Sequence, residues 1–233
     1  MNSAATEFAA AGEPTPNALP ELDYTTLIQV LAGPEEALCF VHQQKICAKS
    51  PFFVAACSKD WKEGKQKVVR LPTIKHEIVT IYIHWVYTGE FVTQIKPSAG
   101  QDNDQNTALY RRHIDVYLAA QYLLDDALRN EVISSLWHRL PGTQPLPAKE
   151  LVTIVWKETA HGCGLQRLLV DVMARWMPQD SSSQDSVKDH CLEFVRSLAV
   201  RLLEVREQPT YAYNPSVVGL CYYQDHEKVE KCG

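Results

Sequence analysis

The residues of this sequence best suited to chemistry lie near its C-terminus. Cys221, His226 and Cys232 bring two thiols and an imidazole within twelve residues, and both groups are common zinc ligands. A closed structural zinc site needs four such donors, so the pattern favours a disordered or loosely packed tail, with a metal site as a weak alternative. His161 and Cys163 offer two further donors, but no second pair lies at a structural-zinc spacing, which indicates a turn.

Motifs that would indicate catalysis are missing from the sequence. It has no glycine-rich phosphate loop and no G-x-S-x-G nucleophile elbow. Two pairs of carboxylates occur, Glu35-Glu36 and Asp125-Asp126. Neighbouring side chains on a helix point apart, so these pairs favour turn and capping roles over acid–base chemistry. We therefore expect no enzymatic activity and no cofactor.

The composition indicates a folded, acidic chain. Its 233 residues are 45% hydrophobic and 22% charged, which predicts a packed core. The formal charge is −5, from 28 acidic against 23 basic residues. The most basic segment, 59–70, is interrupted by Asp60 and Glu63 and lacks the clustered cations of a phosphate-binding groove. No direct nucleic-acid partner is expected.

Two features predict an intracellular protein, cytoplasmic or nuclear. The seven cysteines are odd in number and scattered without short pairs, as is typical of reduced thiols. The first residues lack the basic start and apolar centre of a secretory signal. No apolar run is long enough for a membrane helix, so no membrane association is expected.

Apolar patterning predicts a small sheet and two short helices. Apolar runs at 27–31 and 37–41 flank a Gly-Pro-Glu-Glu turn sequence, which indicates a β-hairpin. Short helices are predicted over 42–48 and 51–58, before a third strand over 68–71. A serine before the second helix can cap it, and the proline that follows fits a first helical turn.

The strongest helical signal follows the third strand. Its apolar residues recur at the three-and-four spacing of a buried helix face, and Gly89 is predicted to end the helix in the left-handed conformation. A last short strand is predicted at 91–92 and a mobile loop at 96–108, before helical text resumes near Ile114. The periodic positions of the first helix are Ile78, Ile81, Tyr82, Trp85 and Val86.

The remaining chain is predicted to be mostly helical. Three amphipathic stretches cover 148–159, 165–177 and 187–205, after a Leu-Pro-Gly sequence that marks a module boundary. The predicted organisation is a flexible N-terminal arm at 1–23, a domain at 24–137, a C-terminal helical extension at 138–207 and a tail at 208–233.

The order of these elements resembles the BTB/POZ fold. The motifs that carry the match are F-V-H at 40–42, C-A-K-S-P-F-F at 47–53, W-K-E-G at 61–64, V-R-L-P at 69–72 and W-V-Y-T-G-E-F at 85–91. The resemblance covers about 24–137 and is strongest to the short BTB proteins of filamentous fungi. The scaffold positions within it are Val41, His42, Ser50, Pro51, Phe52, Phe53, Leu71, Pro72, Trp85, Tyr87 and Gly89.

The resemblance implies an α+β class, a small β-sheet flanked by a helical cluster and followed by a C-terminal helical extension. It also reaches the tail, where the segment from Cys221 is similar to a C-x-Y-H-x-H…C ending in some fungal relatives. Gln224 stands here in place of the first histidine.

BTB proteins often pair as homodimers around a buried acid–base couple, and this sequence departs from that pattern. The corresponding positions are Thr26 and Gln43, so both charges are absent together. Loss of one charge alone would leave the other buried and unpaired, whereas loss of both avoids that penalty. Three prolines within 1–23 would also disrupt the amphipathic helix that family dimers use.

The expected function is therefore protein–protein interaction without catalysis. The resemblance implies a homodimer, and it further implies an adaptor that recruits substrates to a cullin-3 ubiquitin ligase. Between Gln94 and His113 there is no clear equivalent of the hydrophobic-x-Glu element that cullin-binding members carry. The alternative is a scaffold in a transcriptional or chromatin complex, acting through a DNA-binding partner.

Overall fold

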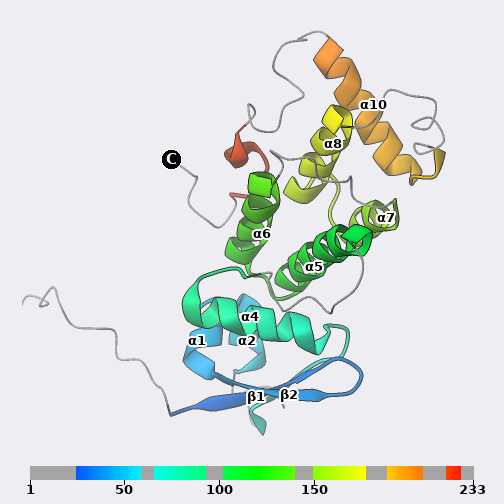
Figure 1. Cartoon of the computed structure of the whole chain (residues 1–233). Helices are drawn as coiled ribbons and strands as arrows, with labels where there is room; N and C mark the ends of the chain where they lie inside the picture. The colour runs from blue at the N-terminus through cyan, green and yellow to red at the C-terminus, as the bar shows by residue number, and fades with distance from the viewer. Residues whose placement is uncertain are drawn as a thin grey trace, which may run out of the picture.

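The computed structural model of this chain describes residues 25–58, 66–92, 102–139, 149–176, 188–206 and 219–226. It has the predicted α+β class, with a small sheet and a larger set of helices (Figure 1). The predicted arm at 1–23 lies outside the described residues. The strands are β1 (Leu27–Ala32), β2 (Ala37–His42) and β3 (Val68–Leu71), and the helices are α1 (Gln43–Cys47), α2 (Pro51–Ala56), α4 (His76–Thr88), α5 (Asp102–Tyr122), α6 (Asp126–Arg139), α7 (Lys149–Glu158), α8 (Gly164–Trp176), α10 (Leu192–Arg206) and the 3-10 turn η1 (Leu220–Tyr222).

The sheet has the strand order β2-β1-β3. β1 and β2 form the predicted antiparallel hairpin, with Leu27 opposite His42 and Leu31 opposite Leu38. β3 runs parallel to β1, because the chain passes through α1 and α2 before it returns. The hairpin turn needs left-handed backbone at Gly33, whose φ is 70°.

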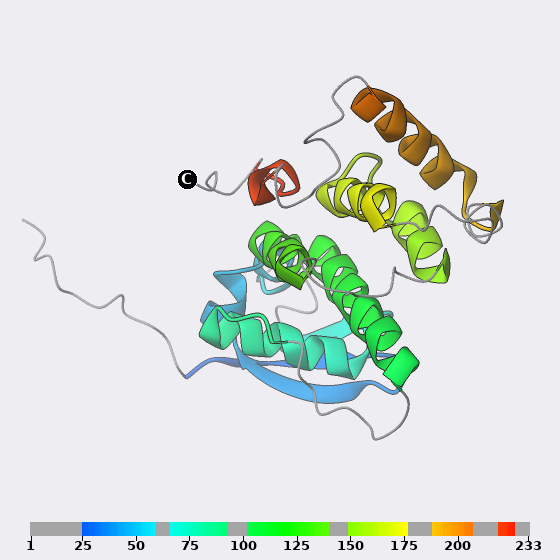
Figure 2. The ribbon, with the colours of Figure 1, turned by 45° about the horizontal axis from the view of Figure 1, so that its top comes forward.

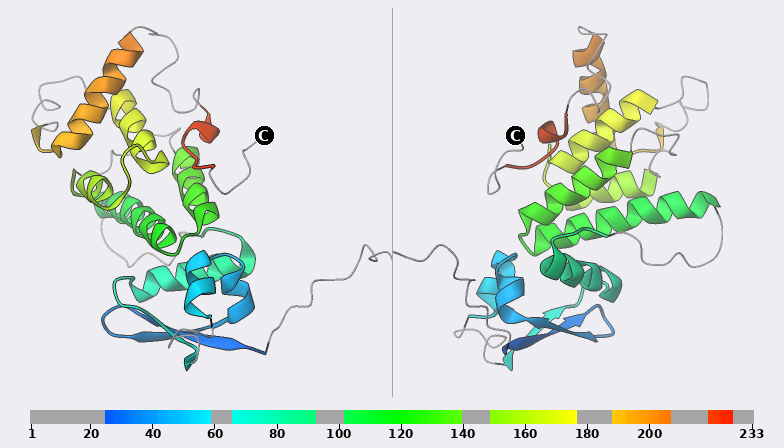
Figure 3. Two further views of the ribbon diagram at one scale, coloured as in Figure 1. Left: turned by 180° about the vertical axis from the view of Figure 1, so that it is seen from behind. Right: turned by 60° about the vertical axis from the view of Figure 1, so that its left-hand side comes forward.

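Helices cover only one face of this sheet in the described part of the chain. α1, α2 and α4 lie directly on it, and the opposite face is bare of ribbon when the molecule is seen from behind (Figure 3). Alternate strand residues point into the core, as the period of a strand requires. The inward side chains, each at most 2% exposed, are Ile28, Val30, Ala32, Val41, Val69 and Leu71.

Ser50 joins the short helices to the rest of the molecule. Its hydroxyl oxygen accepts a hydrogen bond from the Phe53 N–H at 3.2 Å, which is the predicted N-cap of α2. The same hydroxyl donates to the Leu123 carbonyl at 2.6 Å, so the cap also ties α2 to the end of α5. Ser50 is fully buried, and both bonds leave no polar group of its side chain unmatched.

A buried carboxylate, Asp125, connects α4 with α6. Trp85 Nε1–H and the Tyr82 hydroxyl donate to its Oδ2 at 3.0 and 3.3 Å. The Leu128 N–H donates to Oδ1 at 2.9 Å, which makes Asp125 the cap of α6, as its sequence position predicted. Burial raises the pKa of this carboxyl, and the hydrogen bonds to its charged form oppose that rise.

Two predictions for the middle of the chain are wrong. α5 begins at Asp102 rather than near Ile114, so residues 102–108 are helical and not part of a loop. No apolar period marks this start in the sequence, and Thr107 and Ala108 are exposed. Residues 91–92 form no strand; instead the Phe91 ring packs edge-on against His113, with centroids 5.3 Å apart.

The three predicted C-terminal helices are present as α7, α8 and α10. The larger apolar core runs from Ile28 in β1 to Val172 in α8, because α5 packs on α7 and α6 packs on α8. A second, smaller cluster joins α10 to α7 and α8. The larger core therefore crosses the predicted module boundary at 137–138, and that boundary stays a prediction from sequence. Among the described helices, none combines the length and apolar character needed to cross a membrane.

Replacing Trp85 by alanine is expected to lower the free energy of unfolding by about 3–5 kcal/mol, because it empties a large core site and removes a donor from Asp125. Trp85→Phe keeps most of the volume and loses only the N–H bond, so about 1–3 kcal/mol is expected. Urea unfolding of the three proteins measures both. A loss under about 1 kcal/mol for the alanine variant would contradict the packing described for α4.

His113 predicts a pH dependence of stability. Burial lowers the pKa of this imidazole to about 4 from 6.5, because the enclosed ring loses the hydration of its charged form. The hydrogen bond between its Nδ1 and the Leu109 carbonyl, at 2.8 Å, opposes this shift. Between pH 6.5 and 4 the unfolded chain therefore binds a proton that the folded chain excludes. This group's stabilisation is complete above pH 6.5, and about 3 kcal/mol is lost as pH falls through that window.

The measurement is urea unfolding at pH 7 and pH 4.5 for the unmodified chain and for His113→Gln, which cannot titrate. The difference between the two pH values should shrink in His113→Gln. His76→Gln, at the exposed start of α4, is the matched control and should leave it unchanged. Equal pH differences in all three proteins would show that folding does not lower the pKa of His113.

Candidate protein-binding surface

The outer face of the sheet is apolar although no described element covers it. Leu27, Leu38 and Phe40 are 45%, 48% and 55% exposed, and all three point away from the core. Half-buried Leu31 lies opposite Leu38 on the same face. Half-buried Val68 lies across Gln29 from Phe40, and Gln29 is the exposed polar residue of β1 on this face. A sheet with one solvated face normally alternates apolar and polar residues, so this mostly apolar face, which no described element covers, is a candidate binding surface. We call the five apolar residues the outer sheet face.

The two ends of the outer sheet face are polar and internally paired. At one end Arg70 Nε lies 3.1 Å from a carboxylate oxygen of Glu36, and both side chains are exposed. At the other end the Tyr87 hydroxyl lies 2.6 Å from His42 Nδ1 and accepts the His42 backbone N–H at 3.1 Å. His42 therefore fixes the end of β2 against the end of α4, which is a structural role.

The two positions predicted to replace the family's charged couple lie side by side. The Gln43 N–H donates to the Thr26 carbonyl at 3.0 Å, at the corner where β1 starts and α1 begins. Both residues are half-buried and uncharged. This neutral corner adjoins Leu27, so the outer sheet face continues into it without meeting a charge.

The other scaffold positions lie in and around the core. Phe53 is fully buried, and its ring stacks on Tyr82 with centroids 6.4 Å apart. Phe52 is half-buried against Tyr122. Val41, Leu71 and Trp85 are buried, whereas Pro51, Pro72, Tyr87 and Gly89 are exposed, and Gly89 ends α4 with a φ of 71°, as predicted.

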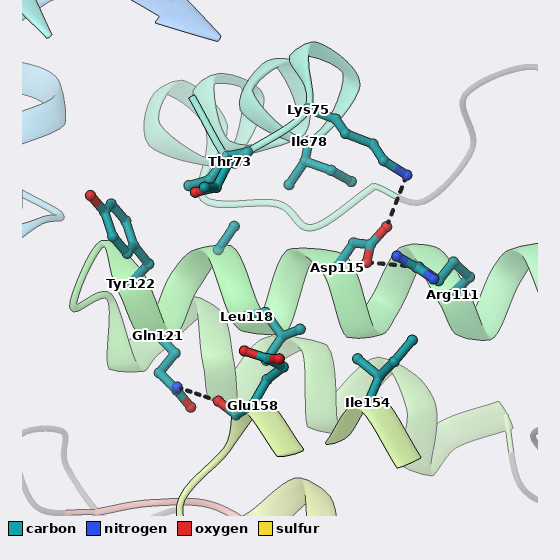
Figure 4. A pocket seen from close by; sticks show the side chains of 12 residues that line it. Thr73, Lys75, Ile78, Arg111, Asp115, Leu118, Gln121, Tyr122, Ile154 and Glu158 are labelled. Carbon is teal, nitrogen blue, oxygen red and sulfur yellow. Dashed lines mark hydrogen bonds and ion pairs between the residues drawn. The ribbon is translucent and has the colours of Figure 1, made fainter. Parts of the chain in front are cut away.

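Apart from the outer sheet face, the described residues form a pocket where α5 runs between the β3–α4 turn and α7 (Figure 4). It has a volume of about 530 Å³, and its floor is apolar, with Ile78, Leu118 and Ile154. We call it the α5 groove. It spans elements on both sides of the predicted module boundary.

The polar groups of the α5 groove bind one another. Asp115 lies 2.8 Å from Arg111 Nε and 3.7 Å from Lys75 Nζ, and Gln121 Nε2 donates to the Glu158 carbonyl at 3.0 Å (Figure 4). These pairs close the rim of the groove around an apolar floor. Such an arrangement suits an apolar ligand, since the charged side chains at the rim already pair with one another.

The C-terminal segment around η1 is packed, which corrects the prediction of a loosely packed tail for residues 219–226. Tyr223 is fully buried, and its hydroxyl donates to Asp171 Oδ2 at 2.7 Å. A side chain on Gly164 would meet the Tyr223 carbonyl oxygen at 1.7 Å, so the first residue of α8 must be glycine for this docking. Figure 2 shows η1 beside α6 and α8.

Salt bridges and amide bonds hold the same segment on α6. Asp225 Oδ2 lies 2.6 Å from Arg129 Nη2, and the Asp225 N–H and carbonyl bond to the Asn130 side chain at 2.9 and 2.8 Å. Gln224 Nε2 donates to the Ser134 hydroxyl at 3.0 Å. No sequence pattern predicted these contacts, because each joins residues about ninety positions apart.

The structure brings together two of the three weak metal candidates. Cys221 Sγ lies 3.1 Å from His226 Nε2, and Cys232 falls outside the described residues. His161 is exposed and Cys163 is buried, and the two belong to a turn, as predicted. Within the described ranges, no group of three or more His, Cys, Asp or Glu side chains is placed to hold a metal ion.

No protein-family model and no curated protein matches this chain.

The outer sheet face was missed by the sequence reasoning, although a signal was present. The runs Leu27-Ile28 and Leu38-Cys39-Phe40 are apolar in both phases of the strand period. Strands buried on one face alternate, while strands covered on both faces read as continuous apolar runs. These runs predicted the strands correctly. Their apolar residues in both phases are also the pattern expected of strands that are covered on both faces.

Proposed function

We propose that this chain is a non-enzymatic protein-interaction module of the BTB/POZ kind that binds a second copy of itself through the outer sheet face. The observation that carries the proposal is the uncovered apolar face formed by Leu27, Leu38 and Phe40. It faces away from α1, α2 and α4, so burying it requires a second molecule or a further segment of chain.

Element order supports the BTB/POZ assignment. An antiparallel hairpin leads through two short helices to a strand parallel to β1, then to a long helix and a helix pair, α5 and α6. This is the order on which the resemblance rests, apart from the missing strand at 91–92. The motif residues Ser50, Phe53 and Trp85 lie in one continuous core beneath the sheet.

The outer sheet face is smaller than a complete protein interface. Strand spacing and rise give a three-stranded face of this length roughly 300 Å², whereas a stable complex buries about 800 Å² on each partner. The face is therefore the apolar centre, and the rim is supplied by the Thr26–Gln43 corner and the Glu36–Arg70 pair. Apolar centres with polar rims are usual in protein complexes.

A second copy is the occupant that the chemistry fits best. The face and its neutral corner carry no unpaired charge, so the matching surface must also be apolar and uncharged, because an unpaired charge buried against it is costly. The same face on another copy has that character. A two-fold dimer uses one self-complementary patch twice.

The resemblance further implies the adaptor role toward a cullin-3 ubiquitin ligase. In that role α7, α8 and α10 would form a separate docking face for a substrate. α10 supports this because Leu192, Val200 and Leu203 are exposed on it.

The proposal predicts that the purified full chain is a dimer at high micromolar concentration and that Leu38→Lys/Phe40→Lys is a monomer. Two lysines placed on each copy would bury charge against an apolar surface. Light scattering coupled to size exclusion measures the mass. Circular dichroism and the melting temperature should stay close to those of the unmodified chain, since both side chains are exposed.

Val54→Lys is the matched control. Val54 is 54% exposed on α2, away from the outer sheet face, and its replacement should leave the dimer intact. An unmodified chain that is strictly monomeric at high micromolar concentration would refute self-association. A double variant that is as dimeric as the parent would place the interface elsewhere.

A further inference from the structure

β2 is one of the two edge strands of the sheet, because the strand order is β2-β1-β3. Only one side of β2 pairs with β1, so half of its backbone N–H and C=O groups point away from the sheet. Groups of this kind bind an added strand, since another extended chain continues the ladder of hydrogen bonds. The register of the hairpin identifies the residues that carry them.

Three residues of β2 direct their backbone groups away from β1. The Gln43 N–H donates to the Thr26 carbonyl at 3.0 Å, so these two residues form a hydrogen-bonded pair. In an antiparallel ladder, such pairs alternate with pairs whose N–H and C=O groups point outward. Because the register is continuous back from Gln43, the outward residues are Leu38, Phe40 and His42.

A hydrogen bond to α4 agrees with this assignment. The His42 N–H donates to the Tyr87 hydroxyl at 3.1 Å, on the side of β2 away from β1, so this outward donor is already occupied. The backbone N–H and C=O groups of Leu38 and Phe40 have no hydrogen-bond partner within the described residues. These four groups form the free part of the β2 edge.

β2 lacks the features that usually keep an edge strand from pairing. Such features are a short strand, charged residues, proline and bulges. β2 has six residues, A-L-C-F-V-H, which include no lysine, arginine, acidic residue or proline. Its register with β1 runs residue for residue, without a bulge. β3, at the other edge, has four residues and carries Arg70, so β2 is the edge that is open to an added strand.

We propose that the free edge of β2 binds an extended segment of a partner protein, which adds to the sheet as an antiparallel strand. The segment has apolar or β-branched residues opposite Leu38 and Phe40, because those two side chains are 48% and 55% exposed on the outer sheet face. The backbone groups supply the affinity and the alternate side chains supply the specificity. This inference goes beyond the proposed dimer and does not depend on it.

The charge of the partner follows from the turn at the end of β2. Glu35 and Glu36 are both exposed there. Glu36 pairs with Arg70 at 3.1 Å, whereas Glu35 has no ion-pair partner within the described ranges. An antiparallel strand runs from His42 toward this turn, so its C-terminal end passes Glu35. A lysine or arginine at that end complements the carboxylate.

The test uses a fluorescein-labelled peptide, Thr-Val-Thr-Val-Thr-Lys, titrated with the full chain and followed by fluorescence anisotropy. In the antiparallel register its two valines lie opposite Phe40 and Leu38, and its lysine reaches the turn. Binding with a dissociation constant of about 100 μM or tighter is expected.

N-methylation of the peptide isolates the backbone contribution. Methyl groups on both valine nitrogens remove the N–H groups that face β2, so binding should weaken at least about tenfold. Methyl groups on the nitrogens of the second and third threonines, which face away from β2, are the matched control. That control peptide should bind within about twofold of the unmodified peptide.

Phe40→Pro and Phe40→Ala test the same edge on the protein. Both variants remove the ring, but only proline removes the outward N–H, and an edge strand tolerates proline where its N–H faces solvent. Phe40→Pro should therefore bind the peptide at least about fivefold more weakly than Phe40→Ala. Circular dichroism checks the fold of both variants, and light scattering on the same samples measures the dimer separately.

The proposal is overturned if the unmodified peptide does not bind at up to about 500 μM protein, or if the two methylated peptides bind equally. It is also overturned if Phe40→Pro, unlike Phe40→Ala, is a folded monomer while the parent is a dimer, because a second copy then occupies the edge. The peptide comparison needs no variant and decides the matter even where Phe40→Pro fails to fold.

Discussion

The arrangement of the chain depends on one buried carboxylate. Asp125 accepts from Trp85 and Tyr82 on α4 and caps α6 through the Leu128 N–H. An ionised group in an apolar interior is costly unless donors surround it, and these three donors come from the two elements that must be joined. The Ser50 hydroxyl makes a similar link, because it donates to the carbonyl of Leu123, two residues before Asp125 in the chain. The layer of helices on the sheet is thereby fastened to the helices above it.

This constraint determines which surfaces remain for binding. α1, α2 and α4 are held on one face of the sheet. The residues of β1 and β2 that point to the opposite face are not covered by any described element. The α5 groove arises for a related reason, because α5 rests on α4 and α7 from different sides. Its charged residues pair with one another, whereas the outer sheet face is uncharged. Of these two surfaces, the outer sheet face is therefore the stronger candidate for a protein-binding site.

Much of the fold follows from local signals in the sequence. Strand and helix periods, the Ser50 cap and the Gly89 stop predicted the hairpin, α1, α2, β3 and α4, because each depends on residues close in the chain. The start of α5 was missed since its first turns carry no apolar period. The docking of residues 219–226 was missed because Tyr223 finds Asp171, and Asp225 finds Arg129, only after the helices pack.

The claim that the outer sheet face is the centre of a dimer interface has a direct test in hydrogen–deuterium exchange of the full chain at low and at high micromolar concentration. The account predicts slower exchange at high concentration, confined to peptides that cover β1, β2 and the Thr26–Gln43 corner. Protection confined to the α5 groove or to α10, or exchange that is independent of concentration everywhere, would contradict it.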